Sequence, residues 1–540
     1  MAVTGYTPQR SLGRFSRTVE KVVTILPQPL NLEVKMYSFK YTPITTYCDQ
    51  DLPQEVIEKV LCCKSFYYTR FDEVRRRTVP YPIKKVIDWN FYNAQSKNFP
   101  SGFLSKVIDM LNFMGEQYQL SVVAVTPDRL KSNMRDAFFA YLTRENKKLR
   151  YFQEEAVDAV LQYDTGMIEI GTGGGKTLFY GNLISTLDVK TLIITIDLTS
   201  KQQTYEELCA MLGDENVGQI DWEDYDKYPV VVANIQNCWV KLKTSKFIQY
   251  GRSVGLLVVN ECHHINEGKL KTSTANTWFQ VATSVPAWYR VGATGTVGNE
   301  DALQGFLFRA AIGEVIYRKP TAALIKEGFA TKIEAHVYPY ECGNLEYMNA
   351  TTAYKNLVTE PAFNIMIADL ALKYANEGKK VAVFCEWHKN QLNVLEKLLG
   401  DRAISVSGKT KKGQERTDRF RAFADGERSI LIGTVFNEDV NIPAMDVGII
   451  MGKMKNERKV KQRTGRIARL FEGKSMGIII IPYIKDKKLV KEFDKRGNEI
   501  IVEKDGMLLR HSKEAIKILE KEGHEIIFKN YAKPKLNLTL

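Results

Sequence analysis

Continuous apolar runs, separated by polar and amphipathic stretches, recur along the chain between about residues 145 and 485. Such runs are typical of strands buried on both faces of a parallel sheet, with helices between them. The pattern restarts after about residue 330, so we expect two successive α/β domains. The runs lie at residues 167–170, 190–195, 229–233, 255–259, 381–385, 429–434 and 447–451.

Residues 168–177 combine one of these runs with a glycine-rich turn and the start of a helical pattern. Successive glycines let backbone N–H groups curl around a polyphosphate, and the following helix N-terminus adds partial positive charge. This order of strand, turn and helix predicts a phosphate-binding loop for ATP, with Lys176 on the β/γ-phosphates and Thr177 on Mg²⁺. A flexible turn between two core elements is the alternative. The loop residues are Thr172, Gly173, Gly174, Gly175, Lys176 and Thr177.

Polar side chains follow several of the predicted strands. Thr199, Asn234 and Gln236 come after two of them, and Thr434 ends a later one. Ligands of open α/β sheets collect at the carboxyl ends of the strands. We therefore predict that these four residues contact phosphate oxygens of a nucleic-acid strand.

Asn260, Glu261 and the tandem histidines stand at the end of a further buried run. A carboxylate in this position can orient an attacking water, and we assign that role to Glu261. For His264 we expect a structural or coupling role at the catalytic site, because no second ligand pair at suitable spacing supports a metal. Thr294 and Thr296, after the next strand, are predicted to link the nucleotide site to the nucleic-acid site.

Residues 461–469 are predicted to form one helix with Gln462, Arg466 and Arg469 on the same face. Arginines presented to a phosphoryl group stabilise the charge of the transition state. A basic surface helix is the alternative.

The totals exclude several classes of protein. With 540 residues, 44% hydrophobic and 26% charged, the chain suits a globular protein of three or four domains. No apolar run is long enough for a membrane span, and residues 1–17 lack the apolar core of a secretion signal. The eight scattered cysteines suggest neither a disulfide framework nor a metal site. We expect a cytoplasmic protein, or one in the host cytoplasm if a phage encodes it.

The net charge of +13 is concentrated at the two ends. Residues 1–150 hold 23 Lys and Arg against 14 Asp and Glu, and residues 451–540 hold 23 against 12. Within the first part, residues 64–90 interleave aromatic residues with cations, including Arg75, Arg76 and Arg77. This composition predicts contacts with phosphates and stacked bases, although a solvated strand face explains it equally well.

The ordered motifs resemble those of the superfamily 2 helicases. They are Gly173–Thr177, Asn260–His263, Gly292–Thr296 and Gln462–Arg469, and the resemblance covers about residues 145–485. It implies two tandem RecA-like domains with parallel sheets, ATP with Mg²⁺ between them and nucleic acid across both. It also implies that Arg150 and Gln153 recognise the adenine edge.

The flanks are similar to those of UvsW-type phage helicases, which implies a small basic α+β domain before the motor. The similarity rests on residues 66–115, including Phe99–Leu104, and on Leu508–Lys513. The expected organisation is an extension of unknown role, a basic nucleic-acid-binding domain, two RecA-like domains and a basic extension. Their bounds are 1–60, 61–140, 141–325, 326–485 and 486–540.

Two positions depart from the family pattern. Asn260 stands where the family usually has an Asp that holds Mg²⁺ through water, and an amide lacks the negative charge. The residue is either a natural variant or an introduced change, and slow ATP turnover is expected. Asp439 and Asn441 replace the usual Gly and Asp.

The function implied is an ATP-dependent DNA helicase or translocase that remodels branched or forked DNA, and we expect it to work as a monomer. Three alternatives stay open at this point. They are an RNA helicase, a restriction-type DNA translocase and a DNA-binding module that ATP clamps without efficient hydrolysis.

Overall fold

The computed structural model describes most of the chain, in segments. They are residues 36–72, 77–265, 276–298, 300, 302–342, 350–387, 391–407, 410, 414–434, 445–452, 454, 457–469, 474, 476–493 and 499–531. Within them, side chains are not described at residues 65–72, 77–85, 350, 414, 417, 458–459, 487–493 and 499–504. Among the described helices, none has the length and apolar character that a membrane crossing needs.

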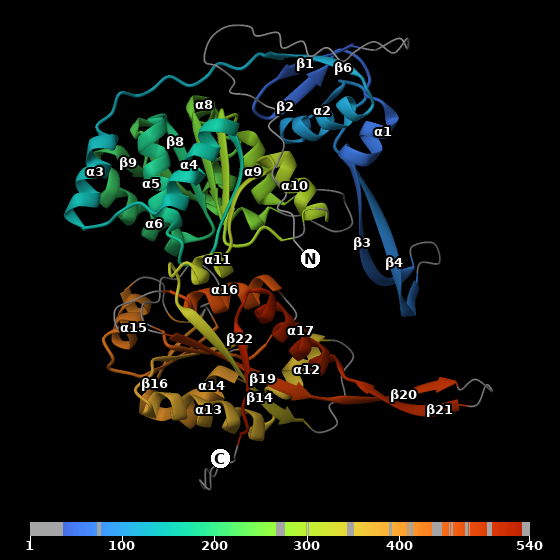
Figure 1. Cartoon of the computed structure of the whole chain (residues 1–540), viewed down its shortest axis with the longest axis vertical. Helices are drawn as coiled ribbons and strands as arrows, with labels where there is room; N and C mark the ends of the chain where they lie inside the picture. Colours follow the sequence, from blue (N-terminus) through green and yellow to red (C-terminus); the bar gives the residue numbers. More distant parts are fainter. Residues whose placement is uncertain are drawn as a thin grey trace. The chain divides into compact units, whose positions relative to one another are not determined.

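The chain divides into two compact units (Figure 1). The first comprises Met1–Glu169 and Gly175–Arg318, and the second comprises Ile170–Gly174 and Lys319–Leu540. Each unit contains its own large parallel sheet in the described residues, and each is described separately below.

A small sheet opens the described part of the first unit, in the order β5-β2-β1-β6. Helix α2 lies next to it, and its buried residues at helical spacing join a core of aromatic and aliphatic side chains. The elements are β1 (Met36–Tyr41), β2 (Thr45–Cys48), β5 (Asn98–Pro100), β6 (Gln117–Val122), α1 (Gln54–Val56), the 3₁₀ turn η2 (Ser101–Phe103) and α2 (Leu104–Phe113).

A long antiparallel hairpin leaves this small domain (Figure 1). It is formed by β3 (Cys62–Asp72) and β4 (Arg77–Asn90). Its base is anchored, because Trp89 is buried in the core of the first large sheet and Cys63 and Ile87 pack against that core.

The first large sheet has the order β13-β7-β12-β11-β8-β10-β9 in the described residues. Neighbouring strands from β9 to β7 run parallel, and every residue of β8, β10, β11 and β12 is buried. This burial explains the continuous apolar runs. The strands are β7 (Thr165–Ile170), β8 (Thr191–Thr195), β9 (Val217–Gln219), β10 (Val230–Asn234), β11 (Leu256–Asn260), β12 (Tyr289–Thr294) and β13 (Val315–Lys319).

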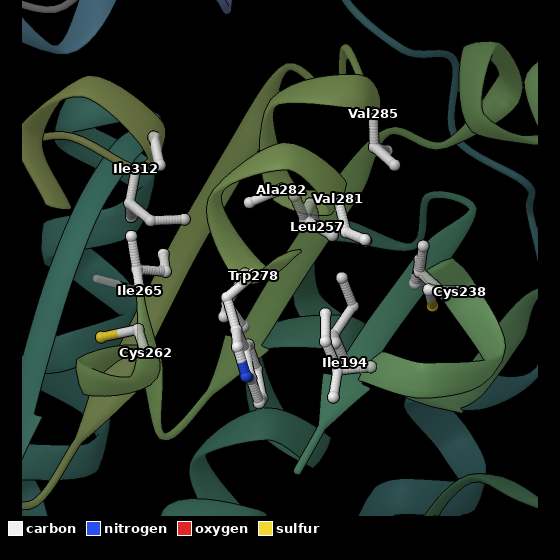
Figure 2. Close-up of a cluster of buried hydrophobic side chains, with 14 of the residues drawn as sticks. Ile194, Cys238, Leu257, Cys262, Ile265, Trp278, Val281, Ala282, Val285 and Ile312 are labelled. Carbon is white, nitrogen blue, oxygen red and sulfur yellow. The ribbon is translucent and has the colours of Figure 1, made fainter. Parts of the chain in front are cut away.

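Two groups of helices accompany this sheet. Helices α3, α5 and α6 pack against one another, and α9 packs against both α7 and α10. Figure 2 shows α9 side chains, Trp278 and Val281 among them, meeting Leu257 of β11 in a buried apolar cluster. The helices are α3 (Met134–Arg144), α4 (Tyr151–Tyr163), α5 (Lys176–Leu187), α6 (Leu198–Leu212), α7 (Ile235–Lys241), α8 (Ser245–Ser253), α9 (Thr277–Ser284) and α10 (Leu303–Ala311).

The second unit repeats the architecture with the order β16-β17-β15-β18-β19-β14-β22 in its described residues, all neighbours parallel. Its strands are β14 (Lys332–Glu341), β15 (Val381–Phe384), β16 (Ala403–Val406), β17 (Ile430–Gly433), β18 (Val447–Ile450), β19 (Met476–Lys485) and β22 (Glu525–Phe528). A separate hairpin, β20 (Lys487–Phe493) with β21 (Glu499–Asp505), follows β19.

The helices of this unit include α17, whose buried residues face β19 and β22. They are α11 (Thr321–Lys326), α12 (Ala350–Leu357), α13 (Pro361–Asn376), α14 (Asn393–Leu399), α15 (Gln414–Ala424), α16 (Glu457–Ile467) and α17 (Met507–Lys521). The predicted fold class, two tandem α/β domains with parallel sheets flanked by helices, is confirmed.

Candidate active site

The predicted phosphate loop connects β7 to α5. Gly173 and Gly175 have φ angles of +86° and +77°, which only glycine adopts without strain. At Gly175 a side chain is excluded for a second reason, because a Cβ atom would lie 2.6 Å from Gln153 Nε2. Helix α5 begins at the next residue, Lys176. The loop backbone therefore leads directly into the N-terminus of α5, and a glycine turn before a helix N-terminus is the geometry that binds phosphate groups.

Gln153 holds this loop against helix α4. Its Nε2 donates to the carbonyl oxygen of Gly175 at 3.1 Å, and its Oε1 accepts from the backbone N–H of Arg150 at 3.0 Å. The side chain of Gln153 is 1% exposed. Gln153 thus positions the loop, and recognition of adenine by Arg150 and Gln153 stays a prediction.

Glu261 stands at the carboxyl end of β11 in a left-handed conformation, with φ +51° and ψ +49°. Such backbone is uncommon for a residue with a side chain and is concentrated at functional sites. The turn directs the carboxylate to the Lys176 ammonium, with which it forms an ion pair. Burial by itself raises the pKa of the Glu261 carboxyl. The Lys176 ammonium and the His263 imidazole outweigh this and hold that pKa well below its usual range.

His263 and Thr294 complete the surroundings of this carboxylate. His263 Nδ1 lies 3.1 Å from Glu261 Oε2 and 2.8 Å from Thr294 Oγ1. Both His263 and Thr294 are buried, and Thr296 N–H donates to Thr294 Oγ1 at 3.2 Å. The predicted coupling residues Thr294 and Thr296 therefore lie at the site of the predicted water-orienting residue.

The structure separates the two adjacent histidines, and the structural or coupling role expected for His264 stays a prediction. His264 stacks on Trp278 of α9, with ring centroids 5.4 Å apart, while His263 takes the place beside the carboxylate. The left-handed turn at Glu261 decides which of two adjacent imidazoles points back to the sheet. The spacing Asn-Glu-x-His of the motif was the signal that could have identified His263.

Asn260 ends β11 and is almost fully buried. Its Oδ1 accepts a hydrogen bond of 2.7 Å from the hydroxyl of Tyr180 on α5. An amide oxygen carries a second lone pair, and together with the Thr177 hydroxyl it supplies the hard oxygen donors that Mg²⁺ takes. Within the described part of the chain, no group of three or more His, Cys, Asp or Glu residues could hold a metal by itself.

The predicted nucleic-acid contacts of the first unit lie at helix starts. Asn234 is buried and caps α7, its Oδ1 accepting from Asn237 N–H at 3.2 Å, while Gln236 is exposed. Thr199 is half-buried in the first turn of α6. Arg75 and Arg76 lie outside the described residues, and of Arg77 the structure describes only the backbone.

In the second unit, Gln462 and Arg466 lie on α16, and Arg466 is buried. The prediction that the helix continues through Arg469 is wrong, because α16 ends at Ile467. Thr331 explains this end, since its N–H donates to the carbonyl oxygen of Ala468 at 2.7 Å and draws the chain toward β14. Thr434 directly follows β17, and Asp439 and Asn441 lie outside the described residues.

Arg463 is a further residue of this helix that the sequence analysis did not single out. It is 1% exposed, forms an ion pair with Glu386 and donates to the carbonyl oxygen of Gly452 at 2.9 Å. Arg463 therefore holds α16 against the loop after β15. A run of basic residues gave no signal to separate this internal arginine from its neighbours.

Comparisons with known proteins agree with this geometry. The family model described as type III restriction enzyme, res subunit, matches residues 146–299. The model described as helicase conserved C-terminal domain matches residues 364–471. The first match spans the phosphate loop and Glu261, and the second spans α16.

Two relatives and one solved structure extend the comparison. The DNA 3'-5' translocase XPB2 of Sulfurisphaera tokodaii is 25% identical over an alignment of 395 residues, which covers 65% of this chain and 85% of that protein. The probable helicase D10 of Escherichia phage T5 is 24% identical over 322 residues, which are 59% of this chain and 67% of that protein. The crystal structure of T4 UvsW aligns over 92% of this chain and 99% of its own, at 15% identity and a TM-score of 0.37.

The fold, the phosphate loop and the two family matches define a helicase that binds ATP. The two matched domains support a helicase of superfamily 2.

Proposed function

We propose that this protein is an ATP-driven DNA helicase or translocase that remodels branched DNA, such as forks and four-way junctions. The observation that carries the enzymatic part is the cluster of Lys176, Glu261, His263 and Thr294. It joins the phosphate loop to the carboxyl ends of β11 and β12 through an ion pair and hydrogen bonds. A buried, ionised carboxylate beside a phosphate loop has the position and the protonation state that water activation needs.

Each residue of this cluster has its own part in ATP hydrolysis. Bound ATP supplies the phosphoryl group that is transferred to water, with its phosphates on the loop and Lys176 and its Mg²⁺ held through Thr177 and Asn260. Glu261 remains a carboxylate at neutral pH and orients the water, because Lys176 and His263 hold its pKa low. Thr294 links this carboxylate to β12.

We assign to the second domain and to the strand ends the roles predicted for them. Gln462, Arg466 and Arg469 act on the nucleotide from the second RecA-like domain. Thr199, Asn234, Gln236 and Thr434 contact the nucleic-acid backbone. We retain the predicted domain bounds of 61–140 for the basic domain, 141–325 and 326–485 for the motor, and 486–540 for the basic extension.

Two observations support DNA as the substrate. Relatives with about a quarter of their residues identical are named as DNA translocases and helicases. The small domain also projects a hairpin whose sequence is rich in aromatic and basic residues, a composition suited to phosphates and exposed bases at a junction.

The experiment that tests the proposal compares ATP hydrolysis and strand displacement on single-stranded, duplex, forked and four-way DNA and on matched RNA. Strong stimulation by forked and four-way DNA is expected, with affinity that falls steeply as salt rises. Activity on RNA alone, or equal stimulation by linear duplex and junctions, contradicts the proposal. The latter result favours a restriction-type translocase.

A second candidate function rests on Asn260. Without the carboxylate usual at this position, ATP binding could act as a clamp that holds the protein on DNA without efficient turnover. Tight ATP-dependent DNA binding with no measurable hydrolysis identifies the clamp.

A further inference from the structure

The small N-terminal domain is docked on one helix of the first motor domain, α10. Phe306 of α10 stacks on Phe91, with ring centroids 6.1 Å apart, and lies 5.9 Å from Phe103. The Arg309 guanidinium lies over the same Phe103 ring at 5.6 Å. At Gly102 the two backbones meet, because a Cβ atom there would overlap the carbonyl oxygen of Arg309. We call these five residues the docking joint.

The docking joint lies where two buried cores meet, because Phe91 packs against both of them. Trp89, at the base of the β3–β4 hairpin, is buried in the same cluster as residues of the first large sheet and as Leu307 and Phe308 of α10. Ala310 of α10 in turn belongs to the core of the small domain. A close-packed interior does not absorb displacement locally, so a force on the hairpin or the small domain reaches α10.

The other end of α10 reaches the catalytic cluster. Gln304, in its first turn, donates from Nε2 to the backbone carbonyl oxygen of His263 at 2.6 Å. His263 is the residue whose Nδ1 contacts Glu261. Gln304 and Arg309 are five residues apart on one helix, which is about 7.5 Å at the usual rise per residue. One short, rigid element thus spans from the docking joint to the motif that carries Glu261.

Helix α9 makes a parallel connection. Phe279 packs against the cores of both the small domain and the large sheet. Its neighbour Trp278 stacks on His264, and Asn276 Nδ2 donates to the backbone carbonyl oxygen of His264 at 2.6 Å. Figure 2 shows Trp278 and Cys262 in the same buried cluster. The backbone of the Glu261 turn is therefore held on two sides by helices that touch the small domain.

We propose that α10 couples engagement of the N-terminal domain to ATP hydrolysis, and that Gln304 is the positioning residue that transmits it to His263 and Glu261. This inference rests on the proposed function, since it names nucleic-acid binding by the small domain as the event that changes the rate of ATP hydrolysis. When a branched nucleic acid loads the small domain, α10 shifts with the docking joint, and Gln304 moves the His263 backbone. The orientation of the Glu261 carboxylate changes with it.

The test uses the full chain with Gln304→Leu, which removes the donor, and Gln304→Glu, which keeps the size but places a carboxylate against a carbonyl oxygen. Gln50→Leu is the matched control, because Gln50 Nε2 also donates to a backbone carbonyl oxygen, that of Met36 at 2.7 Å, far from α10 in sequence. Measured quantities are kcat and KM for ATP with and without forked DNA, and the Kd for forked DNA by fluorescence anisotropy. Phe306→Leu loosens the docking joint without touching His263.

Both Gln304 variants are expected to lose about tenfold of the DNA-stimulated kcat, a typical coupling between sites, with KM and the DNA Kd unchanged. Phe306→Leu is expected to lower the ratio of kcat with forked DNA to kcat without it. Gln50→Leu is expected to leave this ratio unchanged. A structural role alone would lower stability and both rates together and would not change their ratio.

The failures are distinguishable. If the unaltered chain shows no stimulation by DNA, the proposed function fails and this inference fails with it. If the unaltered chain is stimulated and both Gln304 variants keep the full ratio, only the coupling through α10 is overturned.

Discussion

The hydroxyl of Tyr180 donates a 2.7 Å hydrogen bond to Oδ1 of Asn260, joining two buried residues that lie 80 positions apart in the chain. Tyr180 lies on α5, the helix that begins at the phosphate loop, and Asn260 ends β11 beside Glu261. The bond orients the amide with its oxygen toward the helix. A carboxylate at position 260 would accept the same bond, so the fold itself does not require an amide there.

Replacement Asn260→Asp is therefore expected to leave the fold intact and to raise ATP turnover. A negative charge near a divalent cation is worth about 1–2 kcal/mol even in a water-like dielectric, so the Mg²⁺ concentration for half-maximal rate should fall roughly tenfold. The measurement is kcat as a function of Mg²⁺ for both chains. Tyr180→Phe, which removes only the hydroxyl, is the control for altered orientation. Identical Mg²⁺ curves for both chains contradict the role assigned to position 260.

Lys176→Ala is expected to lower kcat about a hundredfold or more, because the variant loses the ammonium that we propose binds the transferred phosphoryl group. The depressed pKa of Glu261 favours folding above the reference pKa of 4.5 and loses that contribution as pH falls toward the folded-state value. In the variant this pKa rises. DNA affinity should be unchanged, because the predicted nucleic-acid contacts are other residues.

Lys246→Ala provides the matched control for this variant. Lys246 also pairs with a carboxylate, Asp226 at 2.7 Å, but on the surface of the unit. Its loss should change neither kcat nor DNA affinity. Loss of DNA binding together with hydrolysis in Lys176→Ala would contradict separate sites for the two ligands.

Because of the close contact in the docking joint, we expect Gly102→Ala to destabilise the protein more than Gly251→Ala does. Gly102→Ala forces a methyl group against the Arg309 carbonyl oxygen and is expected to cost about 1–3 kcal/mol in the free energy of unfolding. Gly251→Ala, on α8, places its methyl group in ordinary contact, 3.8 Å from Val285 Cγ2. It should be neutral or stabilising. Urea unfolding of both variants measures this, and equal midpoints would show that the joint yields without strain.

His524 makes the second unit sensitive to acid. Burial lowers the pKa of its imidazole from 6.5 to about 4, and its Nδ1 has no hydrogen-bond partner among the described residues. The unfolded chain therefore binds a proton at higher pH than the folded chain does. The contribution of His524 to the free energy of unfolding is fully present above pH 6.5 and falls by about 3 kcal/mol as the pH drops to 4.

Hydrogen exchange of the α17 amides measures this loss, since the helix ends just before His524. Exchange should accelerate between pH 6.5 and 4, after correction for the intrinsic rate, and His524→Leu should remove most of the acceleration. An unchanged pH profile in the variant would assign the effect to another group.

Several features of the site could be predicted from local sequence because they are made by neighbouring residues. A strand, a glycine turn and a helix N-terminus occupy residues 165–187 without interruption, and the φ angles of Gly173 and Gly175 follow from residue type. Burial of β8, β10, β11 and β12 follows from their continuous apolar runs. For the same reason the parallel fold was predictable.

Other features depend on contacts between distant residues, and the sequence carried no local signal for them. The ends of helices belong to this group, since Thr331 ends α16 before Arg469 is reached. The surroundings of His264 belong to it too, because its ring stacks on Trp278 of α9.

By itself, the sequence determined the buried strands, the two parallel sheets and the glycine turn between β7 and α5, because hydrophobic periodicity and glycine stereochemistry act over a few residues. Only the tertiary structure decided that Gln153 holds the loop, that Tyr180 orients Asn260 and that Gly102 meets Arg309. Such pairs are formed by packing and hydrogen bonds across the fold, where the partner of a polar or small residue is set by which elements become neighbours and not by its place in the chain.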